Sequence, residues 1–411
     1  MMMMMMMMMN LILILSLVLS VQALKPEISS TTPRPTISPA RTLTSSAVTT
    51  CSMPYQQYNA LYALYNSTNG AGWRSKCNNW IFSLNDTKAP CNGWHGITCN
   101  NLCLVTDISL AYCKLTGTIP TQIQYLTGMQ YLCLSTNSLT GTIPTQVQHL
   151  SDLLVLFLNS NSLTGIIPTQ LQYLTGMGIL YLYENYLSGT IPTEIQYLTN
   201  MQYLDLSLNS LTGTIPTQIL KCSSLKVIYF QSNNLHGSIP STILTLPDLI
   251  GIDLSNNILL SGILDSLLQN NVSRRLTSIV LASISLEGSL PDALFSLPLQ
   301  TLVLSHNCIS GTLPSSICTS PQLTSLILSG IQTNCKHASS NSSHGSIPSC
   351  IFSTPQLQAL HLVGNGLTGT IPDIPSNSTI QNINLARNRL SGMSNNFNYS
   401  SSNINSNHNY H

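Results

Sequence analysis

The side chains in this sequence that could carry out catalysis are few and scattered. Asp205 and Asp253 are two repeat periods apart, which corresponds to about 10 Å at a strand spacing of about 4.8 Å. Two carboxylates at that distance could hydrolyse a glycoside, but no other feature indicates a substrate cleft. No nucleophile elbow, phosphate-binding loop or kinase signature occurs in the structural context that it requires. We therefore predict that the protein is not an enzyme and uses no cofactor.

Cysteine and histidine are the other reactive residues. Of the 12 cysteines, five crowd into residues 51–103, which favours disulfides formed in an oxidising compartment. Cys99 and Cys103 form a close pair, but no second pair and no histidine stand at ligand spacing, so we predict no metal site. Cys113 occupies a repeat position that other copies fill with asparagine, and we expect it to be a free, buried thiol.

A repeat of about 24 residues must position all of these side chains. Its clearest copy is LTNMQYLDLSLNSLTGTIP, residues 198–216, and the first six copies of its Gly-x-Ile-Pro end follow in steps of 24. A fixed period of this length predicts a solenoid. The recurring glycines are Gly117, Gly141, Gly165, Gly189, Gly213 and Gly237, and in looser form Gly262, Gly288, Gly311, Gly345, Gly369 and Gly392.

Each copy predicts one short strand followed by a turn. Leu204 and Leu206 alternate with other residues, so the leucines should point inward and neighbours such as Asp205 and Ser207 should face solvent. An asparagine then begins the turn, and its amide can bond the backbone of its own coil and of the next one. Nine of the 12 copies contain it: Asn137, Asn161, Asn185, Asn209, Asn233, Asn257, Asn307, Asn365 and Asn388.

These motifs resemble the plant-type leucine-rich repeat, LxxLxLxxNxLxGxIPxxLxxL, from Cys91 to about Gly392. ALYALYNSTNGAGW and PCNGWHGITC resemble the cap that precedes such extracellular repeats. The resemblance implies an α/β repeat solenoid, a right-handed curved superhelix of about 12 coils with a parallel β-sheet on its concave face. It also implies a disulfide between Cys91 and Cys99, although Gly93 makes their spacing one residue longer than usual.

Five segments are expected along the chain. Residues 1–23 are apolar and end in Val-Gln-Ala, which predicts a signal peptide; no basic residue precedes Lys25, so an uncleaved membrane anchor is the alternative. Residues 24–50 are a disordered Ser/Thr/Pro-rich linker. Residues 51–104 form a Cys/Trp-rich cap with a helix over 58–65, residues 105–392 are the repeats, and residues 393–411 are a disordered Asn/Ser-rich tail.

Two interruptions of the repeat, at 257–275 and 332–344, are expected to be surface loops. The second could instead be a loop that binds ligand, as in some receptors of this type. No paired-cysteine cap, membrane-spanning helix, lipid-anchor signal or kinase follows the repeats, and a truncated sequence is a further alternative.

The composition limits the partners and the compartment. The 14 basic and 13 acidic residues give a net charge of +1, so the protein lacks the field that nucleic acid binding needs. A polar surface with only 7% charged residues suits a secreted glycoprotein, so we predict an extracellular or secretory-pathway location, or a cell-surface membrane anchor. Six sequons are candidate glycosylation sites: Asn66, Asn85, Asn271, Asn341, Asn377 and Asn398.

The candidate binding site is the concave face, where aromatic residues gather on the early coils beside a few acids. Rigid rings above a polar rim are typical of recognition surfaces. By contrast, Tyr125, Tyr173 and Tyr197 recur at one place outside the strand and are interpreted as packing residues. The candidate ligand-binding residues are Tyr131, Phe157, Tyr181, Tyr183, Glu184, Tyr203, Asp205, Tyr229 and Asp253.

We therefore predict a non-catalytic extracellular recognition protein that binds a protein, a peptide or a cell-wall glycan, in signalling or defence. Two alternatives remain open. One is a structural or adhesive wall-associated glycoprotein, for which the linker and the low charge suffice. The other is an ectodomain fragment of a membrane receptor.

Overall fold

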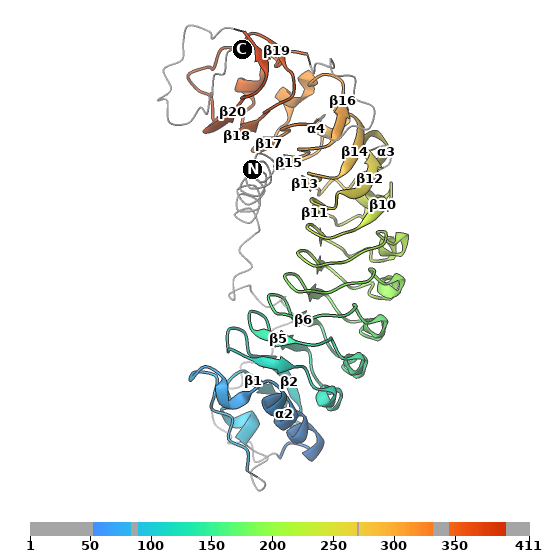
Figure 1. The fold of residues 1–411 in the computed structure, drawn as a ribbon, viewed down its shortest axis with the longest axis vertical. Helices are drawn as coiled ribbons and strands as arrows, with labels where there is room; N and C mark the ends of the chain where they lie inside the picture. Colours follow the sequence, from blue (N-terminus) through green and yellow to red (C-terminus); the bar gives the residue numbers. More distant parts are fainter. Residues whose placement is uncertain (1–51, 84–88, 269–270, 332–344, 392–411) are drawn as a thin grey trace, which may run out of the picture. The chain divides into compact units, whose positions relative to one another are not determined.

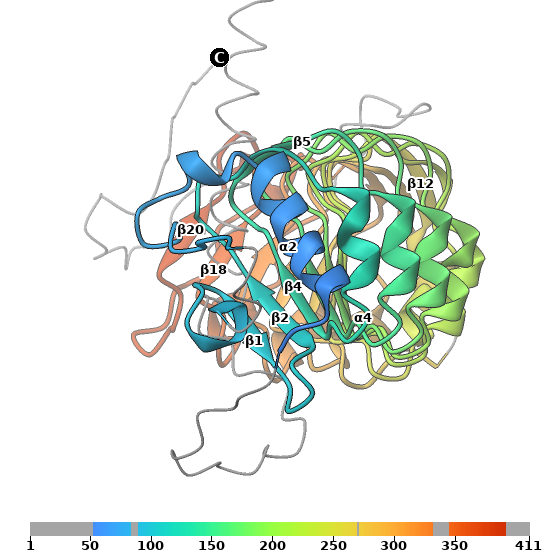
Figure 2. The same cartoon turned by 90° about the horizontal axis from the view of Figure 1, so that it is seen from below.

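A parallel β-sheet runs along the concave side of a curved solenoid. The computed structural model describes residues 52–83, 89–268, 271–331 and 345–391. Figure 1 shows the sheet lining the inner side of the curve, and Figure 2 shows the stacked coils nearly end-on. The predicted α/β solenoid is confirmed. The sheet strands, in spatial order, are β1 (Ile97–Cys99), β2 (Val105–Ser109), β4 (Tyr131–Cys133), β6 (Val155–Phe157), β7 (Ile179–Tyr181), β8 (Tyr203–Asp205), β9 (Val227–Tyr229), β11 (Gly251–Asp253), β13 (Ser278–Val280), β15 (Thr301–Val303), β17 (Ser325–Ile327), β18 (Ala359–His361) and β20 (Asn382–Asn384).

Only the first pair of this sheet, β1 with β2, is antiparallel. Short strands from the Leu-Thr-Gly-Thr segments form a second layer: β3 (Thr116–Thr118) with β5 (Ser138–Thr140); β10 (His236–Ser238), β12 (Leu259–Ile263), β14 (Ser285–Ser289) and β16 (Cys308–Ser310); and β19 (Thr368–Gly369) with β21 (Arg389–Leu390).

Single helical turns close the coils on the side away from the concave sheet (Figure 1). They are η3 (Thr121–Tyr125), η4 (Thr145–His149), η5 (Thr169–Tyr173), η6 (Thr193–Tyr197), η7 (Thr217–Lys221), η8 (Ile243–Thr245), α3 (Leu264–Leu268), α4 (Asp292–Phe295), η9 (Ser315–Thr319) and η10 (Ile351–Ser353).

The asparagines form a ladder that joins neighbouring coils. The Asn185 Nδ2 donates to the carbonyl of Leu182 in its own coil and to that of Leu158 in the preceding coil, both at 3.0 Å. Its Oδ1 accepts from the Leu163 N–H, also in the preceding coil, at 3.0 Å. The side-chain bonds therefore run to the asparagine's own coil and to the preceding one, not to the next coil as predicted. The next coil is joined by the Asn185 backbone N–H, which donates to the Leu208 carbonyl at 3.2 Å.

Asn185→Ala should lower the free energy of unfolding by about 1–3 kcal/mol, because it leaves buried backbone groups without partners. The matched control is Asn234→Ala, which removes an exposed asparagine side chain two coils farther along the solenoid. Thermal unfolding followed by circular dichroism measures both variants. Equal melting temperatures would contradict the role assigned to the ladder.

An N-terminal cap covers the first coil. Helix α2 (Tyr55–Ser67) includes the predicted helix over 58–65, and it ends before a left-handed Asn69 and the turn η1 (Gly70–Gly72). Trp73, Trp80 and Trp94 are all buried in the same cap, which also contains the turn η2 (Ala89–Asn92). The cap shields leucines that the open end of a solenoid would otherwise expose to water.

Hydrogen bonds donated by backbone N–H groups of the first coil fix the cap to that coil. The Thr116 N–H donates to the Thr68 carbonyl at 3.2 Å, and the Val105 N–H donates to the Gln57 Oε1 at 2.9 Å. Gly117 has φ +80°, and a Cβ there would lie 2.1 Å from the Ser67 carbonyl oxygen. The end of α2 thus approaches the first coil so closely that only glycine fits.

The first interruption, at 257–275, is not a surface loop as predicted. It contains β12 and α3, and Asp265, which replaces the usual proline, accepts bonds from the Ser289 N–H at 3.1 Å and the Ser289 Oγ at 3.2 Å. The extra residue of this coil is accommodated by placing the side chains of Ile258 and Leu259 in solvent. The second interruption, at 332–344, lies outside the described residues, as do the predicted signal, linker and tail segments.

In the part of the chain that the structure describes, no helix combines the length and the apolar character needed to cross a membrane.

Candidate functional site

The predicted aromatic residues lie together on the concave face. Phe157 and Tyr181 stand opposite each other on β6 and β7, and their rings stack with centroids 4.8 Å apart and planes 13° apart. Tyr131 meets Phe157 edge-on at 5.8 Å, and Tyr183 lies 6.0 Å from Tyr181. The four rings therefore form one connected row across three neighbouring coils. We call Tyr131, Phe157, Tyr181 and Tyr183 the ring row.

Asp205 and Asp253 differ from the prediction, because both side chains are buried. They are 4% and 3% exposed, and the Oδ1 of each accepts bonds from the backbone N–H and the Oγ of the serine two residues later. Ser207, expected on the surface, is also fully buried, and its Oγ donates a hydrogen bond to Asp205. The Asp-x-Ser sequence at 205–207 and 253–255 was the available signal for this local pairing.

Tyr229 lies between the two aspartates. Strand pairing places it opposite Asp205 on one side and opposite Asp253 on the other. Burial, followed by the charges of Asp253 and Asp205, raises the pKa of Tyr229 to about 12, because both effects disfavour the phenolate. Burial, followed by Asp205 and then Glu184, raises the pKa of Tyr183 to about 12. The pKa of Tyr181 rises further, again through burial and then Asp205.

The remaining predicted residues lie at the margin of this group. The exposed Glu184 accepts a 2.6 Å bond from the Ser160 Oγ. The Lys226 ammonium lies 5.9 Å from the centre of the Tyr203 ring and donates to the Gln202 Oε1 at 2.8 Å. All nine predicted residues therefore belong to one face of β4 to β11 and the turns directly after these strands.

The sequence analysis missed an aliphatic cluster farther along the same face. Val280, Val303 and Ile327 follow Asp253 in register on β13, β15 and β17, and Ala282 packs with them. All four are buried in a small cluster separate from the main core. The signal was present, because three successive copies place a β-branched aliphatic residue where earlier copies place aromatics or acids. We call Val280, Ala282, Val303 and Ile327 the aliphatic cluster.

The tyrosines interpreted as packing residues are not buried. Tyr125, Tyr173 and Tyr197 end the helical turns η3, η5 and η6 and are 42%, 57% and 51% exposed. They lie on the side of the solenoid away from the concave sheet, so they serve as controls for that face.

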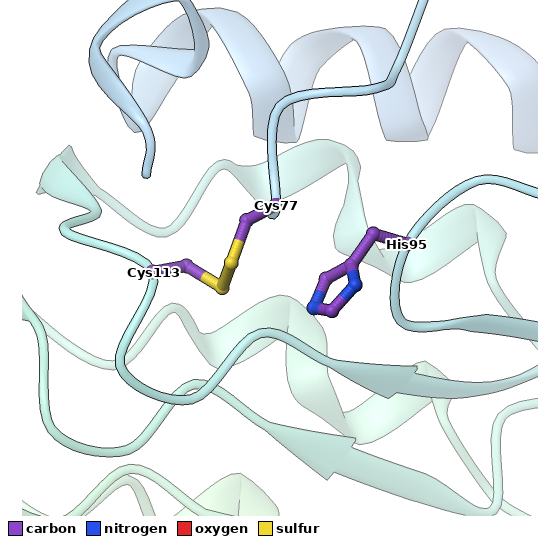
Figure 3. Close-up of side chains that lie close together, drawn as sticks. All are labelled: Cys77, His95 and Cys113. Atoms are coloured by element: carbon purple, nitrogen blue, oxygen red, sulfur yellow. A yellow bond between two sulfur atoms is a disulfide. The ribbon is translucent and has the colours of Figure 1, made fainter. Parts of the chain in front are cut away.

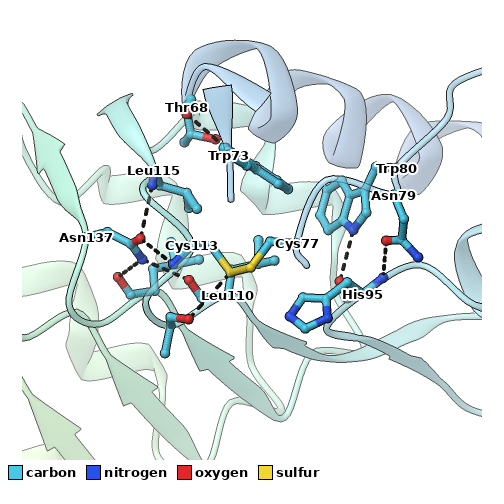
Figure 4. The surroundings of a disulfide bond; sticks show 12 residues. Thr68, Trp73, Cys77, Asn79, Trp80, His95, Leu110, Cys113, Leu115 and Asn137 are labelled. Atoms are coloured by element: carbon cyan, nitrogen blue, oxygen red, sulfur yellow. Dashed lines mark hydrogen bonds between the residues drawn. A yellow bond between two sulfur atoms is a disulfide. The ribbon is translucent and has the colours of Figure 1, made fainter. Parts of the chain in front are cut away.

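Cys113 is not free, because it forms a disulfide with Cys77 (Figure 4). The fold also brings His95 close, with its ligand atom and the two sulfurs within 4.8 Å of one another (Figure 3). Sequence spacing could not reveal this histidine. Since the sulfurs are bonded to each other, neither is available as a thiolate ligand, and we assign no metal site to the three residues.

Further disulfides brace the ends of the solenoid. Cys91 pairs with Cys99, as the family resemblance implies, and Cys318 pairs with Cys350. Cys103 and Cys308 are also disulfide-bonded. Within the described residues Cys133 and Cys222 are free thiols, and burial raises the pKa of Cys222 to about 11, which makes it a poor nucleophile.

Three of the predicted glycosylation sites can be placed. The side chains of Asn66, Asn271 and Asn377 are exposed, so each is accessible to a glycan. Asn85, Asn341 and Asn398 lie outside the described residues.

Comparison with known proteins supports the architecture. The family model for the Leucine Rich Repeat matches residues 200–222, 298–320 and 356–378. The LRR ectodomain of the plant receptor kinase GASSHO1/SCHENGEN3 from Arabidopsis thaliana, solved with CASPARIAN STRIP INTEGRITY FACTOR 2, is 28% identical with a TM-score of 0.68, over 82% of this chain and 42% of that one. The chain is a plant-type leucine-rich repeat protein.

Two more solved structures share the fold of this leucine-rich repeat protein. PEPR1, solved with AtPEP1, is 27% identical with a TM-score of 0.67, over 81% of this chain and 45% of that one. The plant peptide hormone receptor RGFR1, solved with RGF2, is 30% identical with a TM-score of 0.58, over 71% of this chain and 53% of that one. The chain thus spans about half the length of these receptors or less. No curated protein matches it.

Proposed function

We propose that this protein is a non-catalytic extracellular recognition protein that binds a peptide or protein segment along its concave face. The ring row carries the proposal, because connected aromatic side chains on a solvent-facing sheet are typical of binding hot spots. Similarity to RGFR1, a plant peptide hormone receptor solved with RGF2, supports the same class of ligand.

The ring geometry favours a peptide over a sugar that stacks on the face of an aromatic ring. Side chains stand roughly perpendicular to a sheet, and Phe157 and Tyr181 turn one face toward each other. What they present to a ligand is therefore ring edges and the Tyr181 hydroxyl. Glycan binding, and a purely structural wall role, are the competing outcomes of the test.

The test is to isolate a partner with the secreted protein and to titrate it by calorimetry against Tyr181→Ala, Tyr203→Ala and Tyr229→Ala. At least one change should cost more than about 2 kcal/mol of binding free energy, because central interface aromatics contribute most of the affinity. Tyr125→Ala and Tyr173→Ala are the controls, and they should leave binding unchanged, since both rings lie on the side away from the concave sheet.

Parent-like affinity in all three concave variants, with unchanged circular dichroism, would rule out the concave face as the site. The absence of any saturable partner would favour the structural alternative.

A further inference from the structure

Three basic side chains gather where the cap meets the first coil. Arg74 and Lys76 belong to the cap, Lys114 belongs to the first coil, and all three are exposed. The Arg74 backbone N–H donates to the Cys113 carbonyl at 2.9 Å. The disulfide between Cys77 and Cys113, with α-carbons 5.8 Å apart, holds the two segments together (Figure 4). We call Arg74, Lys76 and Lys114 the basic patch.

The charge of the basic patch is not neutralised by neighbouring acids. In the described residues 52–83 and 89–150, the one acidic residue is Asp107, whose carboxylate accepts a bond from the Thr106 Oγ1 at 2.8 Å. None of the ion pairs among the described residues involves a cation of the patch. The patch is therefore a local positive region on a chain whose net charge is only +1.

The backbone beneath the patch is held in place before any ligand binds. The N–H groups of Cys113 and Leu115 both donate to the Asn137 Oδ1 at 3.0 Å, and the Tyr112 N–H donates to the Ser135 carbonyl at 3.2 Å. These bonds join the turn to the following coil, and the disulfide joins it to the cap. A ligand would therefore meet cations on a fixed backbone, which lowers the entropy lost on binding.

The basic patch continues the surface of the ring row. Tyr112, which precedes Cys113, is 52% exposed. Burial is the largest cause of the raised pKa of Tyr183, and Tyr112 also contributes, so the two hydroxyl groups lie within electrostatic range of each other. Tyr131 lies on β4, which pairs with β2 just before Tyr112. A ligand on the ring row that extends toward the cap therefore meets Tyr112 and then the basic patch.

Strand spacing gives the distance between the two contacts. Phe157 on β6 is two strands from β2, about 10 Å at a spacing of about 4.8 Å. An extended peptide advances about 3.3–3.6 Å per residue. Because Lys114 lies a few residues beyond the end of β2, a peptide would reach the patch about three to five positions from the residue that contacts Phe157.

We propose that the basic patch binds an acidic segment of the same peptide or protein ligand whose apolar part lies on the ring row. Aspartate and glutamate side chains are complementary to three exposed cations, and Arg74 can hold a carboxylate through two parallel bonds. The exposed Glu184, three coils from Tyr112, disfavours an acidic segment at the other end of the ring row. This inference rests on the proposed function and deepens it, because it specifies the charge of the ligand and its direction.

The test selects a displayed library of random peptides of about ten residues, long enough to span the ring row and the patch, against the full chain. Enriched peptides should carry acidic residues about three to five positions from an apolar or aromatic residue. The triple variant Arg74→Gln, Lys76→Gln and Lys114→Gln should bind them at least about tenfold more weakly, because it removes the charges that attract the carboxylates. The fold should persist, since these side chains are exposed and the bonds beneath them are donated by backbone groups.

The matched control is Lys221→Gln with Arg274→Gln and Arg389→Gln, which removes the same charge at three exposed sites away from the cap. It should bind like the parent. A second measurement changes the peptide instead: replacing its acidic residues by asparagine or glutamine should weaken binding to the parent about tenfold, and should weaken binding to the triple variant much less. Added salt should also weaken binding to the parent, because it screens exposed charges.

The possible outcomes separate the two proposals. Peptides that lose affinity for Tyr181→Ala, Tyr203→Ala or Tyr229→Ala, but lack acidic residues or bind the triple variant as tightly as the parent, overturn this inference and leave the proposed function standing. A control variant that binds as weakly as the triple variant also overturns this inference, because net charge alone would then explain the effect. If no peptide is enriched, or none loses affinity for a tyrosine variant, the proposed function fails and this inference fails with it.

Discussion

The double variant Cys77→Ser with Cys113→Ser is expected to lower the free energy of unfolding by about 4 kcal/mol. This disulfide spans 36 residues, and cross-linking a loop of that length removes about that much conformational free energy from the unfolded chain. Both cysteines are fully buried between the cap and the first coil, so their loss also loosens the cover over the leucines. Denaturant unfolding of the protein, with and without reductant, measures the effect.

The control for this disulfide is Cys133→Ser, which changes a buried free thiol that already contacts the Ser135 Oγ at 3.3 Å. It should cost much less than the double variant. Limited proteolysis provides a second measurement, because the double variant should be cleaved first within the cap. A double variant as stable as Cys133→Ser, with an intact cap, would show that the hydrogen bonds of Thr116 and Val105 suffice to hold the cap.

The repeat was predictable because its restraints are local and periodic. Each leucine of the strand, each asparagine of the turn and each glycine after it performs the same task in every coil, so a period of 24 residues reveals all of them together. The parallel sheet and the position of the ring row follow from stacking such coils. The direction of the asparagine bonds was mispredicted, since a single copy does not reveal which of its two neighbouring coils the side-chain amide reaches.

The errors concern contacts between different parts of the chain. Cys113 was expected to be free, yet five cysteines precede it in residues 51–103, an odd number that requires a partner from outside the cap if all are to pair. His95 approaches the disulfide only because the cap folds back on itself. Asp205 and Asp253 were expected in solvent, and they are buried because each has a serine two residues later as a local donor.

Gly117→Ala is expected to cost about 2–5 kcal/mol. Its positive φ alone makes alanine unfavourable by about 1–2 kcal/mol. In addition the new Cβ would lie 2.1 Å from the Ser67 carbonyl oxygen, a backbone atom that cannot rotate away as a side chain can. Overpacking of this kind costs about 1–3 kcal/mol more. Denaturant unfolding of the variant measures the total.

Gly364→Ala separates the two contributions to this loss. Gly364 also has a positive φ, +69°, but a Cβ there would have nothing within 4 Å, so the variant should lose only the conformational part, about 1–2 kcal/mol. The difference between the two variants therefore measures how rigidly the end of α2 is held on the first coil. Equal losses would mean that the cap moves aside to admit a methyl group, and the disulfide at Cys113 would then be the main restraint on its position.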